Sequence, residues 1–245
     1  MSGEIDNSNR STHHPVQSGM MDTRIKLNVI VTGATGMVGE GAMIECLRHP
    51  DVETVLIINR KPSGFTHPKL KEIVHGDFYD LSAIEPQLQG YNACFFCLGV
   101  SSVGKKEEEY RHVTYDLTMH VANTLAKLNT DMTFCYVSGA GTDSTEHGRS
   151  MWARVKGKTE NDLMRLPFKR VFAFRPGMLQ PTLGMKNVLK YYKYFGWLYP
   201  ILRRVWPSSA STLKELGLAM IHVASKGYST SIMEVRDIVA AAGLE

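Results

Sequence analysis

The sequence predicts an α/β protein with a doubly wound parallel sheet and a small C-terminal lobe. From Lys26 onward, short apolar runs alternate with stretches in which apolar residues recur at helical spacing. The apolar runs are nearly continuous, which is typical of parallel strands that are covered by helices on both faces. Over 245 residues, 43% hydrophobic and 21% charged residues exclude a disordered or fibrous chain and suffice for one large core.

Each element has its own pattern. The β-branched run at 27–31 predicts the first strand, and the apolar spacing at 37–48 predicts the first helix. Further strands are expected at 52–58, 72–75, 93–98, 132–137, 170–174 and 232–235, and further helices at 107–129, 150–166 and about 211–225.

The chain is expected to form one domain over residues 24–243, in which 178–235 make the C-terminal, substrate-side lobe. Residues 1–23 are polar and lack aromatic side chains, so we interpret them as a flexible or cloning-derived tail; Leu244-Glu245 is a second candidate remnant. There is no apolar segment of a signal peptide or membrane helix, and four cysteines do not make a disulfide framework. These features predict a cytoplasmic protein.

A glycine-rich turn follows the first strand and opens the first helix. It reads Thr32-Gly33-Ala34-Thr35-Gly36-Met37-Val38-Gly39. Glycines at this spacing permit a tight turn and a close approach of the backbone to a pyrophosphate, and the helix N-terminus supplies free N–H donors. The turn therefore predicts a dinucleotide site of the Rossmann type rather than a simple strand–helix connection.

The end of the second strand indicates which dinucleotide binds. NAD-binding proteins carry a carboxylate there for the ribose hydroxyls, whereas this chain reads Ile58-Asn59-Arg60-Lys61. Arg60 offers a planar fork for a phosphate, and Lys61 adds a second positive charge. We therefore predict NADP as the cofactor; the alternative is that both are solvated surface cations.

Other strand ends supply further candidate residues. Asp77 follows the third strand and is a candidate acceptor for the adenine amino group, and Gly99 would let the cofactor pass close to the backbone after the fourth strand. Cys94 and Cys97 have metal-ligand spacing, but on a strand they face opposite sides, so we predict no metal site. The predicted cofactor-binding residues are Gly33, Thr35, Gly36, Met37, Val38, Arg60, Lys61, Asp77, Phe78, Leu98, Gly99, Lys156, Pro176 and Gly177.

Together these motifs resemble an atypical short-chain dehydrogenase/reductase. The similarity extends from about Asn28 to Asp237 and includes Cys97-Leu98-Gly99, Val155-Lys156-Gly157-Lys158-Thr159-Glu160 and Phe174-Arg175-Pro176-Gly177. The branch it resembles includes the Tat-interacting-protein type oxidoreductase-like proteins and bacterial sugar-nucleotide epimerase-like proteins. The combination is specific for the fold and the dinucleotide but not for the substrate.

The resemblance implies a catalytic Tyr four residues before a Lys, and a Ser at the end of the fifth strand. In that scheme the phenol transfers a proton, and the Lys lowers the pKa of the phenol and binds the nicotinamide ribose. Ser138 and Lys156 are present, but Trp152 stands in the Tyr position. An indole N–H can donate a hydrogen bond but has no useful proton to exchange. The resemblance therefore predicts that Tyr-dependent reductase activity is weak or absent.

Other residues are candidates for the missing acid. Tyr110, Tyr115 and Tyr136 are in the sheet region, Asp143 and His147 are on the loop after Ser138, and the aromatic stretch adds Tyr191, Tyr192 and Tyr194. The simpler interpretation is that the tyrosines pack against other residues and that the Asp–His pair belongs to a surface loop without a catalytic role.

Two functional classes remain open. The first is an NADP-dependent oxidoreductase or epimerase-like enzyme for a small carbonyl or sugar-like substrate. The second is a dinucleotide-binding regulatory or interaction protein with impaired catalysis. The aromatic and basic stretch 186–206 is interpreted as a lid over the substrate, a contact in a homo-oligomer or a membrane-surface contact. A net charge of +4 is too small to indicate nucleic acid as a partner.

Overall fold

The central feature of the computed structural model is a seven-stranded sheet in which every neighbouring pair is parallel. The structure describes residues 26–182, 184–188, 199–206 and 208–244. Along the sheet the strands are β3 (Leu70–Val74), β2 (Val52–Asn59), β1 (Leu27–Thr32), β4 (Ala93–Phe96), β5 (Thr133–Val137), β6 (Arg170–Arg175) and β9 (Ile232–Glu234). The strand order reverses between β1 and β4, and open α/β sheets bind ligands at such a switch point.

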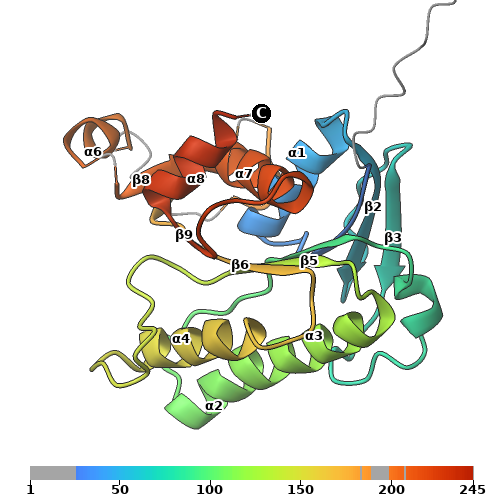
Figure 1. Ribbon diagram of the computed structural model, residues 1–245, viewed down its shortest axis with the longest axis horizontal. Helices are drawn as coiled ribbons and strands as arrows, with labels where there is room; N and C mark the ends of the chain where they lie inside the picture. The colour runs from blue at the N-terminus through green and yellow to red at the C-terminus, as the bar shows by residue number, and fades with distance from the viewer. Residues whose placement is uncertain (1–25, 183, 189–198, 207, 245) are drawn as a thin grey trace, which may run out of the picture.

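Helices cover both faces of the sheet (Figure 1). One layer contains α1 (Met37–Arg48), α7 (Leu213–Ser225) and α8 (Val235–Ala242); the other contains α2 (Glu107–Arg111), α3 (Leu117–Leu128) and α4 (Met151–Leu163). The predicted doubly wound α/β fold is therefore confirmed.

The core consists of two hydrophobic clusters, one on each face of the sheet. Along β1, Val29 and Val31 belong to the cluster beneath α1 and α7, whereas Ile30 belongs to the cluster beneath α3 and α4. All three side chains are completely buried. Burying such a side chain contributes about 1.5–3 kcal/mol, so a strand between two helix layers gains from an apolar residue at every position.

Two elements differ from the expected ones. The helix expected at 107–129 contains a π-helical turn, η2 (His112–Asp116), between α2 and α3. Such turns often occur at functional sites. β3 begins at Leu70, two residues before the expected start, because it is an edge strand whose partly exposed side chains weaken the apolar pattern.

The C-terminal part adds a second, two-stranded parallel sheet of β7 (Met178–Gln180) and β8 (Ala210–Thr212), with α6 (Tyr199–Val205) between them in sequence. However, β9 is an edge strand of the main sheet and α7 packs on α1. The range 178–235 thus shares its core with the sheet, and its description as a lobe stays a prediction. Residues 1–23 and Glu245 lie outside the described residues. Within the described ranges, no helix is long and apolar enough to cross a membrane.

Glu40 ties α1 to the C-terminal part of the chain. Its side chain is completely buried, and its two carboxylate oxygens accept hydrogen bonds from the backbone N–H groups of Lys186 and Asn187, both at 2.7 Å. The Lys186 ammonium donates to the carbonyl oxygen of Gly64 and lies 4.1 Å from the centre of the Phe65 ring. Glu40 therefore joins the first helix to a segment far away in the sequence.

Replacing Glu40 by Ala should destabilise the protein by about 2–4 kcal/mol, because two backbone N–H donors lose their buried, charged acceptor. Urea unfolding followed by circular dichroism measures this loss. The matched control is Glu108→Ala, which removes an exposed carboxylate from the first turn of α2 and should change stability by less than about 1 kcal/mol. Equal effects of the two changes would contradict the role of Glu40.

Candidate functional site

The glycine turn places the N-terminus of α1 at the switch point of the sheet. Gly33 has a φ of +73°, which favours glycine. A Cβ atom on Gly39 would lie 2.2 Å from the carbonyl oxygen of Gly33, so only glycine lets α1 start this close to β1. The N-cap residue is Gly36, which has no side chain to cap the helix. The first N–H groups of α1 are thus available for an anion such as a pyrophosphate.

Beside this turn lies a pocket of about 400 Å³ at the carboxyl ends of β1, β2, β3 and β4. Of the predicted cofactor residues, the structure brings these to its wall: Gly33, Thr35, Arg60, Asp77, Phe78, Leu98 and Gly99. Gly36, Met37 and Val38 lie at the start of α1 instead, and Lys61 is exposed next to Arg60. The space and the glycine turn fit the adenosine half of a dinucleotide.

Arg60 lies at the rim of this pocket with its side chain exposed. Within the described part of the chain, its guanidinium makes no hydrogen bond or ion pair. The loop that it begins is anchored by Glu72, whose Oε1 accepts from the side-chain amide of Asn59 at 2.9 Å and from the backbone N–H of Ser63 at 2.8 Å. An anchored loop thus presents an exposed cation at the rim of the pocket.

The other wall of the pocket contains an aromatic pair that sequence reasoning missed. The rings of Tyr79 and His112 are stacked with centroids 4.7 Å apart, and the Tyr79 hydroxyl donates to the backbone oxygen of His112 at 2.8 Å. Asp77 accepts a hydrogen bond from the backbone N–H of Tyr79 at 2.8 Å. His112 begins the π-helical turn η2, and no local sequence pattern signals that turn.

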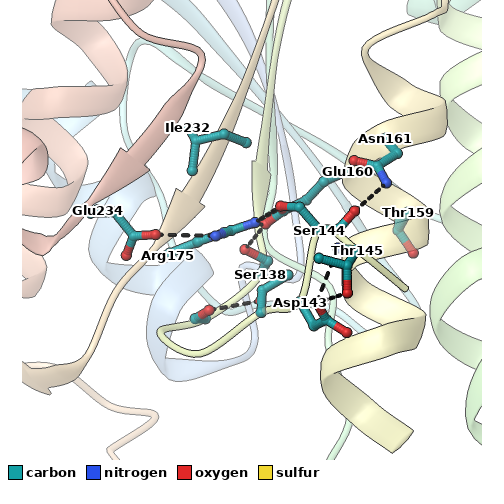
Figure 2. Close-up of polar contacts among 12 residues, drawn as sticks. Ser138, Asp143, Ser144, Thr145, Thr159, Glu160, Asn161, Arg175, Ile232 and Glu234 are labelled. Carbon is teal, nitrogen blue, oxygen red and sulfur yellow. Dashed lines mark hydrogen bonds and ion pairs between the residues drawn. The ribbon is translucent and has the colours of Figure 1, made fainter. Parts of the chain in front are cut away.

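A second group of polar residues lies around the end of β5 (Figure 2). Glu160 of α4 is completely buried and pairs with Arg175 of β6 through both carboxylate oxygens, at 2.5 and 3.1 Å. Arg175 also donates to Ser144 at 2.5 Å and to Glu234 at 3.1 Å. Burial opposes the charge on Arg175, but Glu160 and Glu234 outweigh it and raise its pKa. This network joins α4, β6, β9 and the loop after β5.

Ser138 belongs to the same network. Its side chain is buried, and the hydroxyl oxygen lies 2.5 Å from Glu160 Oε1 and 3.0 Å from the carbonyl oxygen of Phe174. The predicted hydrogen bond from Ser138 to a substrate would compete with these two acceptors. Sequence reasoning missed Glu160, although its place four residues after Lys156, on the same helix face, is a usable signal.

Lys156 reaches the end of β5 from α4. Its ammonium group donates a hydrogen bond to the backbone carbonyl oxygen of Ser138. Burial lowers the pKa of Lys156 to about 8, although the negative charge of Glu160 acts in the opposite direction. Lys156 is therefore a cation that can lose its proton close to neutral pH.

Trp152 lies one turn before Lys156 and is half-buried. The end of its indole covers the backbone of Gly141, where an added Cβ would be 3.6 Å from Trp152 Cη2. The carbonyl oxygen of Pro176 accepts from the N–H of Ala140 at 2.9 Å, and Gly177 packs on the backbone of Ser209. The structure thus brings Trp152 and Pro176 to the same loop after Ser138.

The other candidate acids lie elsewhere. Tyr110 and Tyr136 are buried in the core, and burial raises the pKa of both. Tyr115 donates to Asp162 at 2.7 Å. Asp143 organises its loop by accepting from Thr145 and Gly148, and these hydrogen bonds, Thr145 first, lower its pKa.

Cys94 and Cys97 lie on opposite faces of the sheet. Cys94 packs in the cluster beneath α3, whereas Cys97 packs in the cluster beneath α1, as expected from their spacing. The described residues contain no group of His, Cys, Asp or Glu arranged to hold a metal ion. In the stretch 186–206, Arg203 pairs with Glu215 at 2.5 Å and the Trp206 side chain is 61% exposed. Residues 189–198 lie outside the described residues, so the predictions for this stretch stay predictions.

The chain is similar in sequence to several known proteins. Residues 29–149 match the model of the NAD dependent epimerase/dehydratase family. The rat protein HTATIP2 is 29% identical over 156 residues, which cover 62% of this chain and 62% of that protein, so the match spans less than two thirds of that relative. Protein FMP52, mitochondrial, of Saccharomyces cerevisiae is 28% identical over 209 residues, 81% of this chain and 87% of that protein.

Solved structures show the same fold. A UDP-N-acetylglucosamine 4-epimerase from Methanobrevibacter ruminantium M1, in complex with UDP-N-acetylmuramic acid, superposes with a TM-score of 0.61 at 18% identity, over 85% of this chain and 76% of that one. An NADPH-bound carbonyl reductase from chicken fatty liver superposes with a TM-score of 0.59 at 15% identity, over 86% of this chain and 97% of that one.

The relatives also correct one expectation. The predicted cytoplasmic location is contradicted, because fungal relatives from several species are named mitochondrial. The comparisons agree on the fold: the chain has the Rossmann fold, and its residues 29–149 are similar to the NAD dependent epimerase/dehydratase family.

Proposed function

We propose that this protein is an NADP(H)-dependent oxidoreductase or epimerase-like enzyme that acts on a small carbonyl or sugar-like substrate. The dinucleotide supplies the hydride when it is bound. The first turn of α1 would hold its pyrophosphate, the pocket at the ends of β1 to β4 its adenosine, and Lys156 its nicotinamide ribose. The glycine cradle at Gly33 and Gly39 supports this assignment, because a Cβ at either position would meet backbone.

The choice of NADP rests on Arg60. Arg60 lines the pocket, its guanidinium has no partner among the described residues, and the neighbouring strand end offers Asn59 rather than a carboxylate. A 2′-phosphate at this position would gain a bidentate, charge-assisted contact. The ribose of NAD would meet neither that contact nor the acceptor that it usually finds at this strand end.

Arg60→Ala should weaken the binding of NADPH by about ten- to a hundredfold, which corresponds to a loss of about 1.5–3 kcal/mol, and should change NADH binding little. Fluorescence titration of both nucleotides measures this. Arg236→Ala is the matched control, because Arg236 is exposed on α8 and does not line the pocket. If the unmutated protein binds NADH and NADPH equally, the Arg60 argument is wrong.

The second candidate function is a dinucleotide-binding regulatory or interaction protein with impaired catalysis. It is supported by Trp152, whose indole N–H donates hydrogen bonds but is no general acid, and by the hydrogen bonds that already occupy Ser138. Assays of NADPH oxidation with aldehydes, ketones and quinones distinguish the two. Turnover at about 10 per second, an ordinary enzyme rate, would exclude the regulatory alternative, and binding without turnover would favour it.

A further inference from the structure

We propose that Lys156 is the proton donor of this site, held in place by the buried network of Ser138, Glu160 and Arg175. This inference rests on the proposed function, because it assigns a step to the same dinucleotide site. It makes Lys156 a catalytic residue and Glu160 a positioning residue.

The ammonium group of Lys156 lies at the end of a central strand. Lys156 projects from α4 to the backbone oxygen of Ser138, at the carboxyl end of β5. β5 pairs with β4, and the residues that follow β4, Leu98 and Gly99, line the dinucleotide pocket. The ammonium therefore lies at the same edge of the sheet as the pocket, where ligands of parallel α/β sheets react.

The titratable groups around Lys156 are committed to other contacts. Glu160 and Arg175 neutralise each other in a buried ion pair. Asp143 accepts hydrogen bonds from its own loop, and Tyr115 donates to Asp162. Trp152, one turn away on the same helix, has only an indole N–H, which does not transfer protons. Among the described groups around the end of β5, Lys156 is the one whose proton is not committed to a side-chain partner.

The charges around Lys156 explain how it can do so. Glu160, on the same helix, favours the charged ammonium, while burial disfavours it and is the larger effect. The positive charge of Arg175 on β6 reduces the effect of Glu160 on Lys156, because Arg175 pairs with Glu160. Arg175 also pairs with Glu234 on β9. The resulting pKa of about 8 leaves most of the lysine protonated at pH 7, and an acid whose pKa lies near the working pH transfers protons efficiently.

The step balances without a further reactant. The substrate carbonyl carbon takes the hydride that the reduced dinucleotide supplies, and the carbonyl oxygen takes a proton from the Lys156 ammonium. One N–H bond breaks, one O–H bond forms, and the lysine is left as a neutral amine. That amine regains its proton from water before the next turnover.

The first test needs no substrate. The rate at which an amine-specific acylating reagent modifies Lys156 is measured against pH by mass spectrometry, with exposed Lys71 in the same digest as the reference for the reagent. We expect a midpoint near pH 8 and protection of Lys156, but not of Lys71, by NADPH. A midpoint near the ordinary lysine value of about 10.4, or no protection by bound NADPH, overturns the proposal.

The second test uses variants that separate charge from proton transfer. Lys156→Arg keeps a cation that stays protonated, so it should retain much of the NADPH affinity and lose about 100- to 10,000-fold in kcat/KM. Lys156→Met should lose both the NADPH affinity and the catalytic rate. In the unmutated protein, kcat/KM for NADPH oxidation with simple carbonyl compounds should fall as pH rises above about 8, because the acid form disappears. This decline should be absent in Lys156→Arg.

The outcomes distinguish this proposal from the cofactor proposal. If Lys156→Arg keeps both the rate and the decline above pH 8, Lys156 is not the donor. If NADPH binds but no carbonyl compound in the panel is reduced, the proton-donor role is wrong and the cofactor site stands. If NADPH does not bind to the unmutated protein, the proposed function fails first. Thermal melting of each variant verifies folding, and the labelling test uses only the unmutated chain.

Discussion

Arg175→Met is expected to destabilise the protein by about 3–5 kcal/mol, because it leaves the carboxylate of Glu160 buried without its partner. Glu160 is completely inaccessible to solvent, and the Arg175 side chain is 11% exposed. Water therefore cannot replace the lost partner. The free energy of unfolding from urea titration measures the loss.

The double variant Glu160→Gln, Arg175→Met should recover part of this stability, since it removes the unpaired charge together with its partner. Lys169→Met is the control, because it breaks the exposed ion pair with Asp131 and should change stability by less than about 1 kcal/mol. A cost below about 1 kcal/mol for Arg175→Met would show that the buried pair does not hold α4 to β6 and β9.

Gly39→Ala is expected to destabilise the protein by about 3 kcal/mol or more and to abolish detectable NADPH binding. The added Cβ would lie 2.2 Å from the carbonyl oxygen of Gly33, which is backbone and cannot rotate away. α1 must therefore shift from β1, and the N–H donors proposed for the pyrophosphate shift with it. Overpacking of this kind usually costs about 1–3 kcal/mol of stability. We expect a cost at the upper end of this range or above it, because the clash is with backbone that cannot rotate away.

Gly99→Ala is the matched control for that change. A Cβ on Gly99 meets nothing within 4 Å, so thermal stability should stay within about 0.5 kcal/mol of the unmutated protein. Because Gly99 lines the pocket, the methyl group should reduce NADPH affinity without unfolding the chain. If Gly39→Ala binds NADPH as tightly as the unmutated protein, the first turn of α1 is not the pyrophosphate site.

The fold could be predicted because each buried strand has a recognisable apolar run in its own segment of the sequence. A strand between two helix layers favours an apolar residue at every position, and the run at 29–31 has this pattern without reference to its neighbours. β3 was placed two residues late because an edge strand is partly exposed, so its pattern is diluted by residues such as Lys71 and Glu72. The π-helical turn η2 was missed because no local sequence pattern distinguishes its i→i+5 hydrogen bonds from those of an α-helix.

Some residues of the candidate site could be predicted from the sequence and others could not. The glycine turn and Arg60 are contiguous with the strands they follow, so sequence reasoning found them. Arg175 and Glu160 are 15 residues apart and belong to a strand and a helix. Each looks ordinary in its own element, and only the packing of α4 beside β6 brings their charges together. Buried ion pairs that join separate elements leave no periodic pattern in the sequence, which is why this network was missed.

The most direct measurement for the whole account is a crystal structure of the protein with NADP+. The account predicts that the 2′-phosphate contacts Arg60, that the pyrophosphate meets the first turn of α1 after Gly36, and that the nicotinamide lies beside Lys156. A dinucleotide whose adenosine lies outside the pocket, or whose 2′-phosphate faces solvent away from Arg60, would contradict it.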